Sequence, residues 1–511
     1  MRNRERIAWA ALIVFALGLR LWALGNMPPH HDEAVHAHFG HEVLATGAYR
    51  YDPTYHGPLL YYVAAVAFAL LGESDVTARL YPALAGAALV AIALLLRRRI
   101  GFRAAWFAGL IAAISPGFLY YSRFARNDVP VSLFTALALI LFLSVRRSGW
   151  RVLPWVGIAA ALHAISKETF YVTLPLLAAG AAAVAFHAGF WDAMIRAIEW
   201  LRRHAVAVGT AVLWFLVVTL TAYTFFFTHP EDAFFPGKAI GYWYNQHTIQ
   251  RVGGPWFYHL PRLALYEFLP VFGALVWAVR RRSRLRAIEV FCLAWGVSGI
   301  AMYCFLGEKV PWLIVHQVLP FIPLAAMQLG RTFGPAGRWW SRSIAGAALA
   351  ATLWSAVALG FLHPAMTTAD PHAEMLVYVQ TTPEAKELAR RGVEIAAATA
   401  EDPVAAVDGE GTWPLSWQWR AVKVWWSQPA DGMRPPLVVC DPKDREAVAA
   451  KLGEGYEVTP VPLRAWWVEE WKGVKLTEVA RWFFTRRAWS PIGATEVTVF
   501  VRSDYVAPEG E

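Results

Sequence analysis

The sequence predicts an α-helical polytopic membrane protein with about 11 transmembrane helices and a C-terminal extracytoplasmic α/β domain. Three observations predict this class. Hydrophobic residues make up 57% of the 511 positions and charged residues only 17%, whereas soluble domains carry about 25% charged residues. Apolar runs of spanning length recur through residues 1–362, and arginines cluster between them. This composition excludes a purely soluble enzyme and a disordered chain.

Eleven apolar runs approach the roughly 20 residues that a spanning helix needs. They lie near residues 7–25, 78–96, 104–121, 129–145, 152–166, 170–187, 205–227, 262–279, 288–306, 312–329 and 343–362. A further run at 58–72 is shorter and flanked by polar residues. We interpret it as a helix that lies at the interface or dips into the bilayer.

Arginine clusters predict the orientation of these spans. The clusters occupy every second connection, near residues 2–6, 97–103, 146–151, 196–203, 280–286 and 331–342. The positive-inside rule makes that side cytoplasmic, so the N-terminus is expected inside and residues 363–511 outside. The first run lacks a small-residue cleavage site and is expected to be retained as a helix. The expected location is the plasma membrane.

Charge divides the chain at the same place. Residues 1–362 carry a net charge of +15 and residues 363–511 a net charge of −6. The basic part is the apolar part, so the total of +9 does not indicate a nucleic-acid partner. Only three lysines precede residue 363, and all lie in the connections opposite the arginine clusters. The three cysteines lack zinc-ligand spacing and are interpreted as apolar residues.

The tail has the alternating pattern of a small α/β domain. Strands are predicted at 376–381, 403–409, 436–441 and 457–463, and helices at 383–391 and 443–453. The second helix is expected to end at Gly453. We therefore divide the chain into a transmembrane domain, 1–362, with a long first outer loop, 26–77, and an extracytoplasmic domain, 363–511.

Asp32 and Glu33 follow the first span, where adjacent carboxylates are costly near lipid and often mark a functional site. One carboxylate could take a proton from an acceptor while the other orients it or binds a metal. An equally weighted alternative is that the pair begins a helix and interacts with its dipole.

Histidines are concentrated in the same loop. Six of the fifteen lie between residues 30 and 56, namely His30, His31, His36, His38, His41 and His56. Their spacing fits no standard zinc pattern, so support of an acidic site is favoured over direct metal ligation. After His56, a turn leads into an aromatic helix with Tyr61, which suits a polar head group joined to a lipid tail; an aromatic belt is the alternative.

Other outer connections place cations beside acids. These pairs are Arg126 with Asp128, Lys167 with Glu168, and Glu308 with Lys309, the last followed by Trp312 and His316. Each pair alone could be a simple ion pair. Together they favour one anionic head group, gripped by the basic residues, with Asp128 holding a metal or the acceptor. The sequence contains no phosphate loop, Rossmann fingerprint or GxSxG elbow, so it gives no support to a nucleotide-dependent reaction.

The motifs HGPLLYY (56–62), ARNDVP (125–130), SKET (166–169) and GEKVPWLIVH (307–316) occur in this order along residues 1–362. Their order and topology resemble the GT-C superfamily. Within it, they are most similar to the dolichyl-phosphate-mannose–protein mannosyltransferase-like group, family 39. The narrower resemblance is to a prokaryotic branch of flippase-activity-associated proteins.

The resemblance implies a membrane glycosyltransferase that transfers a sugar from a polyprenyl-phosphate donor to a protein, lipid or glycan acceptor on the outer face. It implies that Asp32 activates the acceptor hydroxyl, with Glu33 beside it, and that Asp128 is a second acidic position. Arg126, Lys167 and Lys309 are the implied donor-phosphate ligands. His56 is a further candidate, although many relatives have lysine there. A divalent metal ion is a candidate cofactor.

A non-catalytic role, as an accessory or flippase component for lipid-linked glycans, is the main alternative. A flippase needs polar groups along the path across the bilayer, whereas the acids here gather on one face. An unrelated transporter is disfavoured because the sequence shows no inverted repeat. We therefore expect a transferase, with His31, His36, Tyr61, Glu168, Glu308, Trp312 and His316 completing the site.

Overall fold

The computed structural model describes residues 3–249, 253–335 and 337–505. Arg2 and the last six residues of the predicted outer domain lie outside these ranges. The chain divides into two compact units: unit 1 comprises residues 1–22 and 42–360, and unit 2 comprises residues 23–41 and 361–511. The division at 360 lies close to the predicted boundary at 362. However, residues 23–41, which we predicted as part of the membrane domain, group with unit 2.

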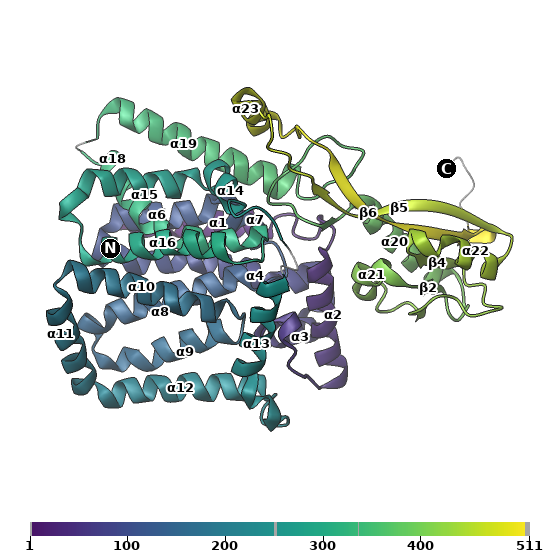
Figure 1. The fold of residues 1–511 in the computed structure, drawn as a ribbon, viewed down its shortest axis with the longest axis horizontal. Coiled ribbons are helices and arrows are strands. Elements are labelled where there is room, and N and C mark those ends of the chain that lie inside the picture. Colours follow the sequence, from purple (N-terminus) through teal and green to yellow (C-terminus); the bar gives the residue numbers. More distant parts are fainter. Residues whose placement is uncertain (1–2, 250–252, 336, 506–511) are drawn as a thin grey trace. The chain divides into compact units, whose positions relative to one another are not determined.

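Unit 1 is a bundle of helices (Figure 1). Its helices are α1 (Asn3–Leu21), α3 (Leu59–Leu71), α4 (Asp75–Ile92), α5 (Arg97–Ile100), α6 (Phe102–Ile114), α7 (Pro116–Tyr121), α8 (Asp128–Ser148), α9 (Leu153–Ala164), α10 (Thr169–His187), α11 (Phe190–Arg203), α12 (Ala205–Tyr223), α13 (Phe235–Ile249), α14 (His259–Leu265), α15 (Phe268–Arg281), α16 (Ala287–Phe305), α17 (Ile314–Val318), α18 (Ile322–Thr332) and α19 (Trp339–Val357). α2 (His31–Thr46) contains the division between the two units.

Each predicted apolar run is largely helical, but fewer helices than expected are long enough to cross a membrane. Among the described residues, 7 helices meet the length and apolarity of a span, or up to 8 if the bent pair α14 and α15 counts as one. The predicted run 104–121 is divided into α6 and α7 at Ser115, and run 262–279 bends by 85° between α14 and α15. α9 has only 12 residues. These breaks and the short α9 explain part of the difference from 11; α1 is unbroken over 19 residues but is not among the candidate spans.

Small residues let the helices of unit 1 approach closely. Gly157 on α9 faces α12, and a Cβ atom there would lie 2.0 Å from the carbonyl oxygen of Ala211. Close backbone approach at glycine and alanine is typical of helix packing in membranes. The same close approach occurs between α15 and α18, where a Cβ at Gly273 would lie 2.8 Å from that of Ala325.

Unit 2 contains a six-stranded mixed sheet in the order β1-β5-β6-β4-β2-β3. Its strands are β1 (Gln380–Thr381), β2 (Ala405–Val407), β3 (Val424–Trp425), β4 (Leu437–Cys440), β5 (Tyr456–Trp467) and β6 (Ile492–Arg502), and its helices are α20 (Pro383–Ala398), α21 (Thr412–Gln418), α22 (Arg445–Leu452) and α23 (Leu476–Thr485). β2 pairs in parallel with β3 and β4, and the other pairs are antiparallel. The expected α/β class is therefore confirmed.

The predicted elements of the tail differ from the structure in detail. Only Gln380–Thr381 of the predicted strand 376–381 is extended, and α20 continues seven residues beyond the predicted end at 391. β6, the partner of β5 along its whole length, was not predicted. Buried Val497, Val499 and Val501 of β6 alternate with residues on the other face, so a period of two was present in the sequence.

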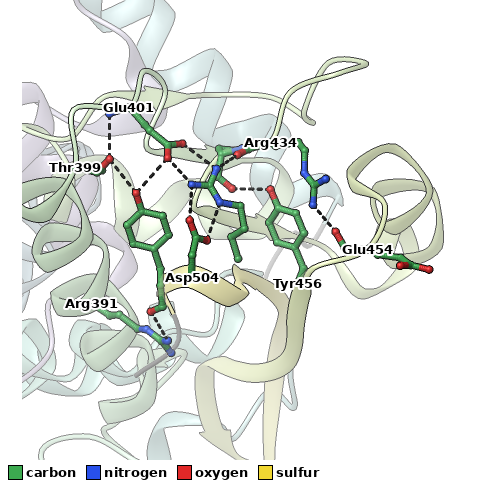
Figure 2. A network of polar contacts seen from close by, with 10 residues as sticks. Arg391, Thr399, Glu401, Arg434, Glu454, Tyr456 and Asp504 are labelled. Atoms are coloured by element: carbon green, nitrogen blue, oxygen red, sulfur yellow. Dashed lines mark hydrogen bonds and ion pairs between the residues drawn. The ribbon is translucent and has the colours of Figure 1, made fainter. Parts of the chain in front are cut away.

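A polar network holds the end of this sheet (Figure 2). The guanidinium of Arg502, the last residue of β6, donates to the carboxylates of Glu401 and Asp504. The hydroxyl of Tyr505 contacts Thr399 Oγ1 at 3.0 Å and Glu401 Oε1 at 3.1 Å. These contacts fasten the residues after β6 to the loop after α20.

Candidate active site

Three connections of unit 1 converge on Asp128. Asp128 is the first residue of α8, where the helix dipole favours a carboxylate. Lys167, between α9 and α10, donates from Nζ to Asp128 Oδ1 over 2.7 Å, and His316 Nε2 of α17 lies 3.1 Å from the same oxygen. Arg126 Nε lies 3.6 Å from Oδ2. The structure therefore brings together four residues predicted from separate motifs.

This Asp128 cluster is buried, and an aromatic ring covers one of its cations. The side chains of Arg126, Asp128, Lys167 and His316 are between 1% and 7% exposed. The Arg126 guanidinium carbon lies 3.6 Å from the centre of the Trp312 ring, a cation–π geometry. Trp312 thus joins the cluster, as its motif predicted.

The cluster places two positive charges on one carboxylate. A lysine ammonium has three donors, and Asp128 is the acceptor that Lys167 contacts within the described ranges, which leaves two N–H groups for a ligand. A buried excess of positive charge is unfavourable unless an anion is paired with it. The arrangement therefore suits an anion with several oxygens, such as a phosphate.

Glu168 faces away from this cluster toward a different set of partners. Its Oε2 lies 2.7 Å from His56 Nδ1, and its Oε1 accepts a hydrogen bond of 3.2 Å from the Tyr51 hydroxyl. The His56 ring stacks on Trp243, with ring centres 5.4 Å apart. His56 is thus paired with a carboxylate, and its role toward the donor phosphate stays a prediction.

The backbone after His56 is held against the same connection that carries Glu168. Leu59 N donates to the carbonyl of Ile165 over 3.0 Å. A Cβ at Gly57 would lie 2.2 Å from that carbonyl oxygen, so only glycine fits between the two segments. Tyr61, in the first turn of α3, is 1% exposed, and its hydroxyl donates to the Tyr55 carbonyl. In this structure the Tyr61 side chain therefore links α3 to the turn before it.

Lys309 lies at the end of α16. Its ammonium donates to the carbonyl oxygens of Tyr303 at 3.0 Å, Cys304 at 2.7 Å and Leu306. These contacts stabilise the C-terminus of the helix, where carbonyl groups lack intrahelical partners. Burial lowers the pKa of Lys309, against the opposing effect of Cys304. Glu308 beside it is half-buried, and the phosphate role of Lys309 stays a prediction.

The carboxylate pair of the first outer loop lies in unit 2, at the start of α2. Glu33 is 2% exposed, and its Oε2 accepts a hydrogen bond of 2.8 Å from the backbone N–H of His30. This is the helix-start contact of the alternative interpretation. Asp32 is half-buried, and its backbone N–H donates to His30 Nδ1. The two acids therefore have different surroundings, which leaves Asp32 as the candidate base.

Arg464 of the sheet lies close enough to Asp32 for their charges to interact. Arg464 on β5 donates from Nη1 to His31 Nδ1 over 3.2 Å. Burial lowers the pKa of Arg464, and the negative charge of Asp32 opposes that shift. Burial also lowers the pKa of His31 to about 4, so its ring is neutral at neutral pH and can accept this bond. His36, on the same helix, is buried.

Further contacts fasten this segment to the rest of unit 2. His30 Nε2 lies 2.9 Å from the Tyr378 carbonyl, and the Gln380 amide donates to the Pro28 carbonyl over 2.8 Å. Lys386 donates to the carbonyls of Gly25 and Asn26 at 3.1 and 2.8 Å. The segment carrying Asp32 is thus an integral part of the sheet-containing unit.

The surroundings of Asp128 do not fit the metal that the sequence suggested there. Its Oδ1 already accepts from a lysine, and Arg126 is its neighbour on the other oxygen. Two positive charges at this distance oppose a divalent cation. We assign no step of the reaction to a metal at Asp128.

Glu267 is a buried acid that the sequence analysis missed. It lies at the bend between α14 and α15, is 1% exposed, and its Oε1 accepts from the Ser115 hydroxyl at 2.7 Å and the Gly117 N–H at 2.8 Å. Its signal was a single acid inside the predicted span 262–279. Through α7, Glu267 positions the turn that carries Arg126 and Asp128.

Replacing Glu267 by Leu is expected to destabilise unit 1 by about 3 kcal/mol, because two buried donors lose their acceptor. The matched variant Glu267→Gln keeps an acceptor oxygen and is expected to stay close to the wild type. Denaturant unfolding of the purified protein in detergent measures the difference. Equal stability of the two variants would contradict this role.

Two buried arginines near the same turn were also missed. Arg79 of α4 is 1% exposed and Arg123 is 5% exposed. Arg123 donates to the carbonyls of Leu19, Arg20 and Trp22 at 3.1, 3.3 and 2.7 Å. Burial and the charge of Arg79 lower the pKa of Arg123 to about 10. Because arginines between apolar runs are mainly topology signals, these two were not predicted as buried residues.

The sequence is similar to known membrane glycosyltransferases. The family described as dolichyl-phosphate-mannose-protein mannosyltransferase matches residues 55–220. An undecaprenyl phosphate-α-4-amino-4-deoxy-L-arabinose arabinosyl transferase of Pseudomonas aeruginosa LESB58 is 28% identical over 276 residues, 51% of this chain and 47% of the relative. A Pseudomonas fluorescens Pf-5 enzyme of the same description is 25% identical over 327 residues, 59% of this chain and 55% of the relative. The chain thus spans about half the length of these curated relatives.

Solved structures share the fold over more of the chain. ArnT from Cupriavidus metallidurans, bound to undecaprenyl phosphate, matches with a TM-score of 0.60 at 18% identity and covers 98% of this chain and 99% of its own. The oligosaccharyltransferase AglB from Archaeoglobus fulgidus matches with a TM-score of 0.53 at 13% identity, over 89% of this chain and 69% of its own.

The helical bundle, the charged connections and the appended sheet domain together define a multi-pass membrane protein with the GT-C fold. The fold expected from the motifs is therefore confirmed.

Proposed function

We propose that this protein is a membrane glycosyltransferase that transfers a sugar from a polyprenyl-phosphate donor to a hydroxyl acceptor. The observation that carries the proposal is the buried Asp128 cluster, where Arg126 and Lys167 lie on one carboxylate and Lys167 keeps donors for an anion. The arabinosyl transferase relatives are named for an undecaprenyl-phosphate sugar, and the Cupriavidus ArnT structure contains undecaprenyl phosphate. Both support this class of donor.

The proposed reaction moves charge onto the donor phosphate. The acceptor oxygen attacks the anomeric carbon, the bond between that carbon and the phosphate oxygen breaks, and the acceptor proton passes to Asp32. The phosphate changes from a diester with one negative charge to a monoester with up to two. Positive groups held in place at that phosphate stabilise the transition state more than the ground state. Arg126 and Lys167 are assigned this role, and Glu33 positions Asp32 by capping α2.

Mass analysis of glycans tests the proposed function. Deletion of the gene is expected to remove one sugar from a surface glycan, lipid or protein and to leave its polyprenyl-phosphate-linked form in the membrane. If the protein were a flippase component, its deletion would also remove the sugar, but the lipid-linked form would stay on the cytoplasmic face. Protease-free, sealed membrane vesicles of both orientations separate these outcomes.

We further propose that the protein lies in the plasma membrane with its N-terminus in the cytoplasm and residues 363–511 outside. The arginine clusters support this orientation, because Lys and Arg are enriched in cytoplasmic connections. The donor and acceptor would then meet on the outer face.

Cysteine labelling tests the orientation. In a variant without Cys292, Cys304 and Cys440, we expect Ala400→Cys, at an exposed position after α20, to react with an impermeant maleimide in intact cells. The matched variant Ser148→Cys, exposed at the end of α8, is expected to react only after permeabilisation. The reverse pattern would overturn the orientation and the proposed outer-face reaction with it.

A further inference from the structure

Three potential metal ligands gather in unit 2, directly after the last long helix of the bundle. His363, Asp370 and His372 each offer one ligand atom, and these atoms lie within 4.8 Å of one another. The spacing His-x6-Asp-x-His was not singled out in the sequence. The site is separate from the Asp128 cluster, which belongs to unit 1.

The local backbone orients two of these ligands before any ion binds. Asp370 Oδ1 accepts from the backbone N–H of His372 at 2.9 Å and contacts His372 Nδ1 at 2.5 Å. His372 also pairs with Arg487 in an isolated antiparallel bridge, and the next residue, Ala373, donates to the Arg486 carbonyl over 2.8 Å. Holding ligands in place in this way reduces the entropy lost on binding.

The third ligand stacks on the second. The rings of His363 and His372 have centres 4.6 Å apart with an angle of 11° between their planes. The neighbouring cation Arg486 is paired with the buried carboxylate of Glu374, which reduces its repulsion of an incoming ion.

The three residues also line a cavity of about 810 Å³. Asp370 is the most exposed of the three, and the two histidines are half-buried. An ion held on the cavity wall by three protein ligands keeps a fourth position for water or another oxygen donor. That open coordination is typical of sites with exchangeable ligands.

We propose that His363, Asp370 and His372 bind a divalent transition-metal ion, with Zn²⁺ as the best match. Two imidazoles and one carboxylate favour zinc and its neighbours over Mg²⁺ and Ca²⁺, which prefer oxygen. Around Zn²⁺, ligand atoms at about 2.0–2.2 Å lie roughly 3.3 Å from one another. Without an ion the three ligand atoms lie within 4.8 Å of one another, so binding requires them to move closer together. The bound ion would link His363, which follows α19, to His372, which pairs with Arg487 just after α23. It would therefore fix the segment between the two histidines.

Metal titration of the full chain tests this proposal. The protein is purified in detergent without a polyhistidine tag, stripped with a chelator and titrated with Zn²⁺ against a chromophoric competitor. We expect His363→Ala and Asp370→Asn to lose one Zn²⁺ per chain, or to weaken that site by about 100-fold or more. The control is His229→Ala, in which the histidine removed also lies near a carboxylate, Glu231, at 3.8 Å, but beside Arg50. We expect His229→Ala to bind Zn²⁺ with the stoichiometry and affinity of the wild type.

Two further measurements keep the test decisive. X-ray absorption of the Zn²⁺-loaded wild type is expected to show two imidazoles among the ligands, which requires no variant to fold. Zn²⁺, but not Mg²⁺, is expected to raise the melting temperature of the wild type and of His229→Ala, and not that of Asp370→Asn. Equal Zn²⁺ stoichiometry and affinity in wild type and triad variants would overturn the proposal, as would a spectrum without imidazole ligands. Neither result bears on sugar transfer.

Discussion

Replacing Asp32 by Asn is expected to abolish sugar transfer while the protein stays folded and inserted. The amide has the shape of the carboxylate but cannot accept the acceptor proton, and a positioned general base contributes about 10²–10⁴-fold to such reactions. The backbone contact of Asp32 with His30 does not involve its carboxylate and is retained. Glycan mass analysis of a deletion strain that carries each variant measures the loss, with membrane abundance determined in parallel.

Two variants of the same loop serve as controls for Asp32→Asn. Asp52→Asn makes the same chemical change at an exposed position where the side chain caps a short helix through Thr54 N, and asparagine caps equally well. Glu33→Gln keeps an oxygen for the His30 N–H. Both are expected to keep most of the activity. Full transfer by Asp32→Asn would remove Asp32 from the mechanism, and full loss in Glu33→Gln would return Glu33 to it.

Replacing Lys167 by Met is expected to weaken undecaprenyl phosphate binding and to lower transfer by about 10²–10³-fold, the usual effect of removing one preorganised group that stabilises developing charge. Methionine keeps most of the volume and removes the ammonium. Asp128 retains Arg126 and His316 as neighbours, so the fold is expected to survive. Binding of undecaprenyl phosphate to the purified protein at two salt concentrations measures the electrostatic part of the loss.

A second lysine–aspartate pair of unit 1 provides the matched control. Lys238 Nζ lies 2.6 Å from Asp232, a buried carboxylate that also contacts Arg50 at 3.3 Å. Lys238→Met therefore removes the same charge from a buried aspartate in a different connection, with a lysine that is 41% exposed where Lys167 is 6% exposed. It is expected to bind undecaprenyl phosphate normally. Similar binding by Lys167→Met and wild type would separate the Asp128 cluster from the donor. Equal losses in both lysine variants would indicate a general effect of charge.

Short motifs predicted which residues gather at Asp128 better than they predicted the helices around it. Arg126, Asp128, Lys167, Trp312 and His316 come from three connections, and the shared rule that charged residues near lipid need partners was enough to group them. The number of spans was less predictable. Apolar composition does not report where Ser115 or Glu267 interrupts a helix, because that depends on which neighbouring segment accepts or donates hydrogen bonds there.

Individual roles were the least predictable from sequence. We predicted that Lys309 and Glu33 serve the reaction site, yet in the structure both contact backbone groups at helix termini. Whether a charge binds a ligand or a backbone depends on a few ångströms of tertiary placement. In the same way, nothing local in residues 23–41 indicated that they contact strands more than 300 residues later.

The packing of residues 23–41 within the sheet-containing unit has a consequence for how the protein is made. His31 and its partner Arg464 are 433 positions apart. At about 5–20 residues per second, the ribosome needs roughly 20 to 90 s to connect them. During that time the segment with Asp32 has been synthesised, but Arg464 and the strands that it packs with have not. On the proposed mechanism, a nascent or prematurely terminated chain lacks the ordered candidate base Asp32, and we expect sugar transfer to begin only when synthesis is almost finished.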